Sequence, residues 1–191
     1  MKANNIYIGS FSSGGNVSLL ISDFITEAKI NIVPKGVFII DSPIDLIALY
    51  KSAEKNINRN FSKKAVQESN WILKTLGKKL GNPNKNISNY EKYAVYTSKT
   101  NNIDNLKNLK NIKIRFYTEP DTIWWKKKRM ADYKQTNAYY IKNLSEKLIK
   151  SRFKNIEYIP TINKGYRANG ERHPHSWSIV NKGNLIKWML N

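Results

Sequence analysis

The sequence predicts an α/β protein built on a parallel sheet of about four strands flanked by helices. A continuous apolar run at 36–40, bounded by turn residues, is typical of a strand buried on both faces. Three more strand-like segments lie near residue 6, at 112–118 and at 156–159, separated by segments with helical spacing of apolar residues. Because strands and helices alternate along the chain, we expect these four strands to be parallel neighbours in chain order.

Helices are expected between and after these strands. Their predicted positions are 17–25, a stretch beginning after Pro43, 63–80, about 132–153, and about 184–190. The segment 56–111 is helical in pattern and contains no clear strand, so we interpret it as a cap-like insertion that folds over one end of the sheet. A chain of 191 residues suits one hydrophobic core, so residues 1–191 are expected to form a single domain.

The charge balance is strongly basic, with a formal net charge of +19 at pH 7. Such a balance is typical of proteins that bind nucleic acids or anionic surfaces. Here the lysines are spread along the whole chain, and the one run of four basic residues is 126–129. We therefore interpret the charge as a bias of composition, and we expect no specific nucleic-acid partner.

Several other classes of site are disfavoured by composition. There is no cysteine, so the chain has no disulfide, thiolate zinc site or cysteine nucleophile. The two histidines, His173 and His175, lie in one proline-containing loop without further ligands at useful spacing, so no metal or other cofactor is expected. Residues 1–5 lack the apolar run of a signal peptide, and no segment approaches membrane-spanning length, so the sequence as written predicts a cytoplasmic protein without a membrane span.

The segment 6–17 carries the clearest functional pattern. A short strand runs into Gly9, Ser10 and a Ser/Gly cluster, and a helix follows directly. A nucleophile on so abrupt a turn needs small neighbours two positions before it and two and three positions after it. Ser12 meets this condition with Ser10, Gly14 and Gly15, whereas Ser13 would place Phe11 among those neighbours. Ser12 is therefore the predicted nucleophile.

At this turn the chain resembles the α/β-hydrolase superfamily, whose G-x-S-x-G nucleophile elbow corresponds to residues 10–14, with serine in place of the first glycine. The resemblance implies a catalytic serine, acid and histidine in that chain order. Ser12 follows the first strand, Asp121 follows the third, and His175 precedes the last helix. A serine hydroxyl needs an imidazole to take its proton, and the imidazole needs a carboxylate partner. The predicted triad is therefore Ser12, Asp121 and His175.

Alternatives remain for two of these positions. Glu119 lies just before Asp121, and Asp41 follows the second strand as a more distant choice for the acid. Asp121 has a second interpretation as the N-cap of a following helix. His173 competes with His175 for the role of base, although Pro174 crowds its ring.

The resemblance also implies an oxyanion hole and a substrate pocket. The backbone N–H of Ser13 is the expected first donor. Trp124 and Trp125, with Tyr117, are expected to line an apolar pocket for the substrate, and packing is the alternative role for at least one tryptophan. In this family a second donor and several strands precede the elbow strand, and this sequence has no counterpart to them. We therefore expect a truncated hydrolase that turns over unactivated esters poorly, completed by a missing N-terminal segment or an oligomer partner.

These patterns predict a serine hydrolase that cleaves a carboxylic ester, or less readily a peptide bond, in a small-molecule or peptide substrate. The alternative is a catalytically inactive remnant or binding module of the same fold. Basic nucleic-acid binding is a third hypothesis, and the salt dependence of affinity would test it.

Overall fold

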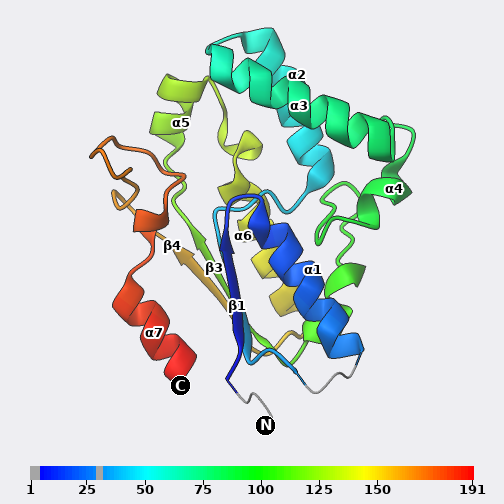
Figure 1. Ribbon diagram of the computed structural model, residues 1–191, viewed down its shortest axis with the longest axis vertical. Coiled ribbons are helices and arrows are strands. Elements are labelled where there is room, and N and C mark those ends of the chain that lie inside the picture. The colour runs from blue at the N-terminus through cyan, green and yellow to red at the C-terminus, as the bar shows by residue number, and fades with distance from the viewer. Residues whose placement is uncertain (1–4, 29–31) are drawn as a thin grey trace.

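The structure, a computed structural model, describes residues 5–28 and 32–191, so most of the N-terminal segment 1–5 lies outside the described residues. Its centre is a sheet of four parallel strands in the order β1-β2-β3-β4 (Figure 1). This order confirms the predicted α/β class and the predicted neighbours. The strands are β1 (Tyr7–Phe11), β2 (Gly36–Ile40), β3 (Lys113–Thr118) and β4 (Ile156–Pro160).

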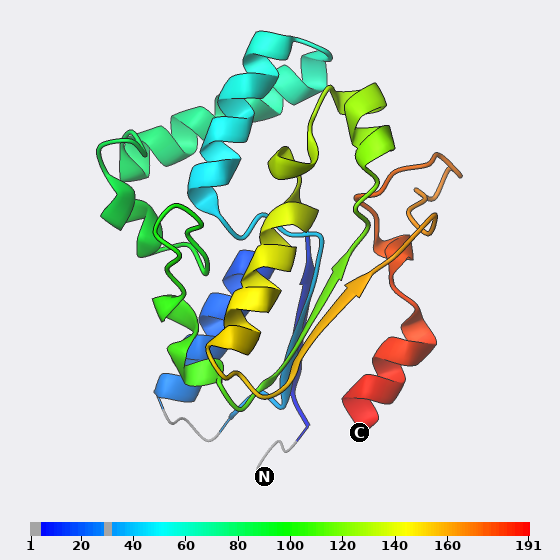
Figure 2. The same ribbon diagram turned by 180° about the vertical axis from the view of Figure 1, so that it is seen from behind.

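Helices cover both faces of the sheet. Figures 1 and 2 show α1 and α6 on one face and α7 on the other. The helices are α1 (Gly14–Glu27), α2 (Leu46–Arg59), α3 (Lys63–Leu80), α4 (Ile87–Glu91), α5 (Thr122–Arg129), α6 (Asn137–Lys150) and α7 (Lys182–Leu190). Three short 3-10 turns are η1 (Asp104–Leu109), η2 (Tyr133–Gln135) and η3 (Trp177–Ile179).

The core consists of two layers, one on each face of the sheet. On the α1 and α6 face, Leu19 and Leu144 pack against Val37 and Phe116 of the central strands, and all four side chains are fully buried. On the α7 face, Ile40 and neighbouring side chains meet η3 and Leu185. Because β2 contributes to both layers, it is a nearly continuous apolar run, as the sequence indicated.

Beyond the carboxyl ends of the strands, α3 of the predicted insertion packs against α2 (Figure 1). The end of the insertion lies elsewhere, because η1 packs against α1 and places Leu106 and Leu109 in the core beneath that helix. The helices α2, α3 and α4 share a small core, in which Ile47, Leu80 and Tyr90 are buried together. The Tyr90 hydroxyl donates a hydrogen bond to the Gly81 carbonyl at 2.8 Å, and burial raises the pKa of Tyr90 to about 12. In the segment 56–111, α3 therefore lies where a cap was predicted, whereas Val95, Leu106 and Leu109 contribute to the main core.

One predicted helix differs from the structure. The segment 132–153 contains η2 and then α6, separated by Thr136, whose backbone is extended. The Thr136 hydroxyl donates to the Tyr133 carbonyl at 2.7 Å, so it competes with helix continuation. Among the described helices, none is both long and apolar enough to cross a membrane.

Candidate functional site

The turn from β1 into α1 holds Ser12 in a strained backbone conformation. Its φ of 56° lies in the left-handed region, which is uncommon for a residue with a side chain. The Ser12 N–H donates to the Ile40 carbonyl at 3.0 Å, and the Ser12 carbonyl accepts from Gly15 N–H at 3.1 Å. These bonds hold the turn from the sheet side and the helix side, as expected for a nucleophile elbow.

The small residues around Ser12 are required by close packing. A Cβ added to Gly15 would lie 2.1 Å from Ser42 Oγ, and one added to Gly14 would lie 3.0 Å from Ser10 Cβ. Real Cβ atoms do not approach other heavy atoms as closely as 2.1 Å, so Gly15 allows α1 to start directly against the end of β2. The sequence argument for small residues at these positions therefore has a direct steric basis.

His175 reaches Ser12 from the loop before η3. The distance from His175 Nε2 to Ser12 Oγ is 3.1 Å, so the predicted contact between serine and histidine is formed. The His175 ring lies against Phe11, with 4.5 Å between ring centroids, and its side chain is 25% exposed. Phe11 thus limits the positions that the imidazole can take, while one side remains open to a ligand.

The carboxylate at His175 is Asp41, which directly follows β2. Its Oδ2 lies 2.7 Å from His175 Nδ1, and its side chain is 5% exposed. The Asp41 backbone is fixed by two bonds, from its N–H to the Tyr117 carbonyl at 2.8 Å and from Asn137 Nδ2 to its own carbonyl at 2.9 Å. A carboxylate only accepts, so Nδ1 carries the proton and Nε2 is free to accept the Ser12 proton.

The prediction that Asp121 contacts His175 is therefore wrong. Asp121 follows β3, whereas Asp41 follows β2, and β2 is the strand beside β1. The Asp121 carboxylate accepts from Arg172 Nη2 at 2.8 Å and from the Trp124 N–H at 2.9 Å. It caps α5, which is the role that the sequence offered as its alternative.

Glu119, the other alternative, is an anchor for the loop that carries the histidines. Its buried carboxylate accepts hydrogen bonds from Thr161 Oγ1, Lys164 N–H and Gly165 N–H at 2.8 to 3.0 Å. It also pairs with Arg172. Glu119 therefore fixes the path of the chain toward His175 and does not contact the imidazole.

His173 is buried and does not reach Ser12. Its Nε2 lies 3.4 Å from Arg129 Nη2, and its Nδ1 is buried without a partner among the described residues. Burial, followed by the charges of Arg167 and Arg129, lowers the pKa of His173 to about 4. His173 is thus neutral at physiological pH and packs on the Trp124 ring, with 4.5 Å between centroids.

Ser13 lies where an oxyanion donor is expected. It is the residue before the first turn of α1, with φ −56° and ψ −24°. Within the described residues, its N–H forms no hydrogen bond to a backbone oxygen outside the helices and strands. The amino end of a helix favours negative charge, so this position can stabilise an oxyanion on the carbon atom that Ser12 Oγ attacks.

A cavity of about 400 Å³ opens onto His175. Trp125 lines this cavity together with Phe61 and Arg129. The Trp125 side chain therefore lies at a position where it could contact substrate, as predicted. Trp124 is absent from this lining, and its ring instead covers His173. The sequence predicted a cap over one end of the sheet and a substrate contact by Trp125, but it carried no signal that Phe61 and Arg129 would line one cavity with His175.

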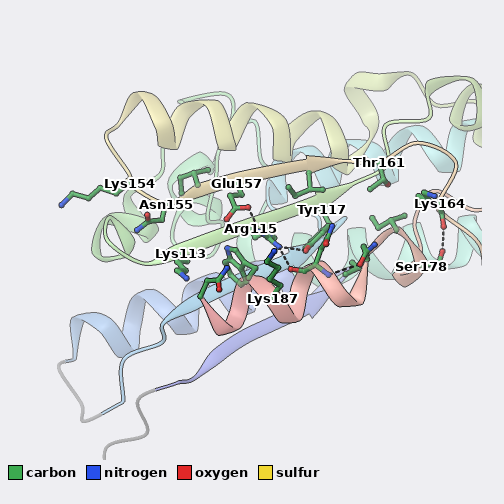
Figure 3. A pocket seen from close by; sticks show the side chains of 18 residues that line it. Lys113, Arg115, Tyr117, Lys154, Asn155, Glu157, Thr161, Lys164, Ser178 and Lys187 are labelled. Carbon is green, nitrogen blue, oxygen red and sulfur yellow. Dashed lines mark hydrogen bonds and ion pairs between the residues drawn. The ribbon is translucent and has the colours of Figure 1, made fainter.

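A second cavity, of about 940 Å³, lies elsewhere, between the β3–β4 part of the sheet and α7 (Figure 3). Arg115 projects into it and bonds Glu157 at 2.5 Å. No member of the Ser12, His175 and Asp41 set lines this cavity. Although this cavity is the larger of the two, it is not part of the candidate site.

In the described part of the chain, no three His, Asp or Glu side chains come together as a set that could hold a metal ion. The site instead combines a serine on a strained turn, an imidazole and a buried carboxylate at the carboxyl ends of β1 and β2. No family model, curated protein or solved structure matches this chain.

Proposed function

We propose that this protein is a serine hydrolase that cleaves carboxylic esters with Ser12 as nucleophile, His175 as general base and acid, and Asp41 as the carboxylate. The observation that carries the proposal is the unbroken chain of contacts from Ser12 Oγ to His175 Nε2, at 3.1 Å, and from His175 Nδ1 to Asp41, at 2.7 Å. The strained φ of Ser12 supports it, since strain at a functional turn is typical of a held nucleophile.

The geometry supports a two-stage reaction. As Ser12 Oγ attacks the ester carbonyl carbon, its proton passes to His175 Nε2, and the negative charge of the tetrahedral intermediate lies near Ser13 N–H. The intermediate collapses when the alcohol oxygen leaves with the proton from Nε2. Water then attacks the acyl carbon while one of its protons passes to His175 Nε2. The Ser12 oxygen leaves with that proton, which releases the acid and restores the Ser12 hydroxyl.

Asp41 has two functions in this cycle. It keeps the Nδ1 proton in place, which leaves Nε2 as the acceptor, and its negative charge stabilises the imidazolium formed in each step. Because the Asp41 side chain is nearly buried, this charge is poorly screened by water. The carboxylate therefore acts on the transition state more strongly than a surface residue at the same distance.

The test is hydrolysis of p-nitrophenyl acetate, whose good leaving group needs little assistance. We expect measurable turnover by the wild-type chain and loss to the buffer rate in Ser12→Ala. The matched control is Ser13→Ala, which keeps the backbone N–H and should retain most of the rate. Equal turnover by wild type and Ser12→Ala would overturn the proposal and favour a non-catalytic binding module of this fold.

A further inference from the structure

The cavity beside His175 has a cationic lining with little to neutralise it. Lys64, Arg129 and Arg167 line it, and Glu68 is its one carboxylate. These residues come from α3, from the end of α5 and from the loop before His173. The folded chain therefore gathers three cations that are distant in sequence around one space of about 400 Å³.

Arg129 is held in place without a carboxylate. Its guanidinium carbon lies 5.4 Å from the Phe61 ring centroid and 5.6 Å from that of Trp124, and Nη2 is 3.4 Å from His173 Nε2. Within the described residues, Arg129 forms no ion pair with a carboxylate, unlike Arg172, which pairs with Asp121 and Glu119. Aromatic rings and a neutral imidazole position the guanidinium and leave its charge uncancelled.

His173 adds to this arrangement as an acceptor. A guanidinium only donates, so the Nε2 of His173 accepts from Arg129 and the ring proton lies on Nδ1. The buried, neutral His173 therefore orients Arg129 without competing with an anion for its charge. Arg167, which lines the same cavity, likewise forms no ion pair among the residues that the structure describes.

We infer that this cavity binds the anionic end of the substrate, so the favoured ester carries a carboxylate near the scissile bond. The inference rests on the proposed ester hydrolysis and adds a substrate class to it. Arg129 is the principal contact, because a guanidinium binds a carboxylate in two parallel hydrogen bonds. Trp125 and Phe61 provide apolar walls for the carbon chain between the carboxylate and the ester.

The test compares ester pairs that differ in charge at similar size. One pair is p-nitrophenyl hydrogen glutarate and p-nitrophenyl valerate, which places the charge on the acyl side. The other is 4-acetoxybenzoate and phenyl acetate, which places it on the alcohol side. We expect kcat/KM to be about tenfold to hundredfold higher for the anionic member of at least one pair, as for a hydrogen bond to a charged group.

Arg129→Gln should bring this ratio close to one, and Arg167→Gln should lower it, which provides a second variant if the first is unstable. The control is Lys126→Gln on the same helix, whose side chain does not line the cavity and whose ratio should match the wild type. The preference should also shrink as salt is raised. Equal kcat/KM within both pairs in the wild type would overturn the inference while leaving ester hydrolysis intact.

A binding measurement separates this inference from the proposed hydrolysis. Glutarate is titrated into Ser12→Ala while the fluorescence of Trp125 and the other tryptophans is followed. Saturable binding that Arg129→Gln abolishes supports the anion site even if no ester is turned over. Failure of glutarate to bind Ser12→Ala would overturn the anion site, as equal rates within both ester pairs would.

Discussion

Replacing Asp41 by asparagine should reduce ester hydrolysis far more than it reduces stability. The substitution is nearly isosteric, and asparagine tolerates the left-handed backbone that Asp41 adopts at φ 41°. It removes the charge that lies 2.7 Å from His175 Nδ1. When asparagine turns its amide N–H₂ toward Nδ1, it also favours the tautomer in which Nε2 holds the proton and cannot accept one from Ser12.

The size of the effect follows from the electrostatics of the pair. Two unit charges about 4 Å apart interact by about 4 kcal/mol at an effective dielectric constant of about 20. If the transition state loses this stabilisation, the rate falls by about 10³-fold. The incorrect tautomer of His175 lowers the rate further. We therefore expect kcat for p-nitrophenyl acetate to fall by about 10³-fold to 10⁴-fold, with KM nearly unchanged.

The matched control is Asp121→Asn. Asparagine remains a good N-cap for α5, while the pair with Arg172 loses its charge. This variant should keep its rate within about threefold and lose at most about 1 kcal/mol of unfolding free energy, as for a partly exposed pair. If Asp121→Asn collapsed the rate and Asp41→Asn did not, the role of Asp41 as the carboxylate partner of His175 would be refuted.

Three further outcomes are expected. Gly15→Ala should lower the free energy of unfolding by about 1 to 3 kcal/mol in urea titrations, because its Cβ would lie 2.1 Å from Ser42 Oγ. A smaller loss of unfolding free energy in Gly15→Ala than in Gly14→Ala would contradict this steric argument. Since burial lowers the pKa of His173 to about 4, the unfolded chain binds more protons than the folded one between pH 4 and about 6.5, so stability should fall as pH drops through this window. The fall should reach at most about 3 kcal/mol and be smaller in His173→Gln, and identical pH dependence of the two proteins would exclude the effect. Lys126→Ala should leave ester hydrolysis unchanged, because Lys126 lines neither the cavity beside His175 nor the cavity beside α7.

The fold was predictable because its signals are local. Each strand is a short apolar run at one place in the chain, and the connections between the strands limit the order in which parallel neighbours can pair. The position of Ser12 was predictable for the same reason, because the small residues that its turn requires lie within three positions of it. Thr136 shows the limit of this reasoning, since one side-chain bond to the backbone divides a segment whose apolar spacing is helical throughout.

The carboxylate was not predictable from the same information. Asp41 and Asp121 each follow a strand at the same edge of the sheet, and adjacent strands are only about 4.8 Å apart. Asp41 has the nearer place because β2 lies beside β1, while Asp121 is bonded by Arg172 from 51 residues away in the chain, a contact that the sequence does not indicate. The cationic cavity was missed for a related reason, because Arg129 and Arg167 come together only through the tertiary placement of α5 and its neighbouring loop.

The most direct test of the central claim is covalent labelling with a fluorophosphonate, which reacts with a serine hydroxyl that a neighbouring imidazole activates. Intact-mass measurement should show one adduct per chain, and peptide mapping should place it on Ser12. Labelling should be lost in Ser12→Ala and should slow markedly in Asp41→Asn, while Ser13→Ala labels as the wild type does. An unlabelled wild-type chain, or an adduct that persists in Ser12→Ala, would contradict the assignment of Ser12 as an activated nucleophile.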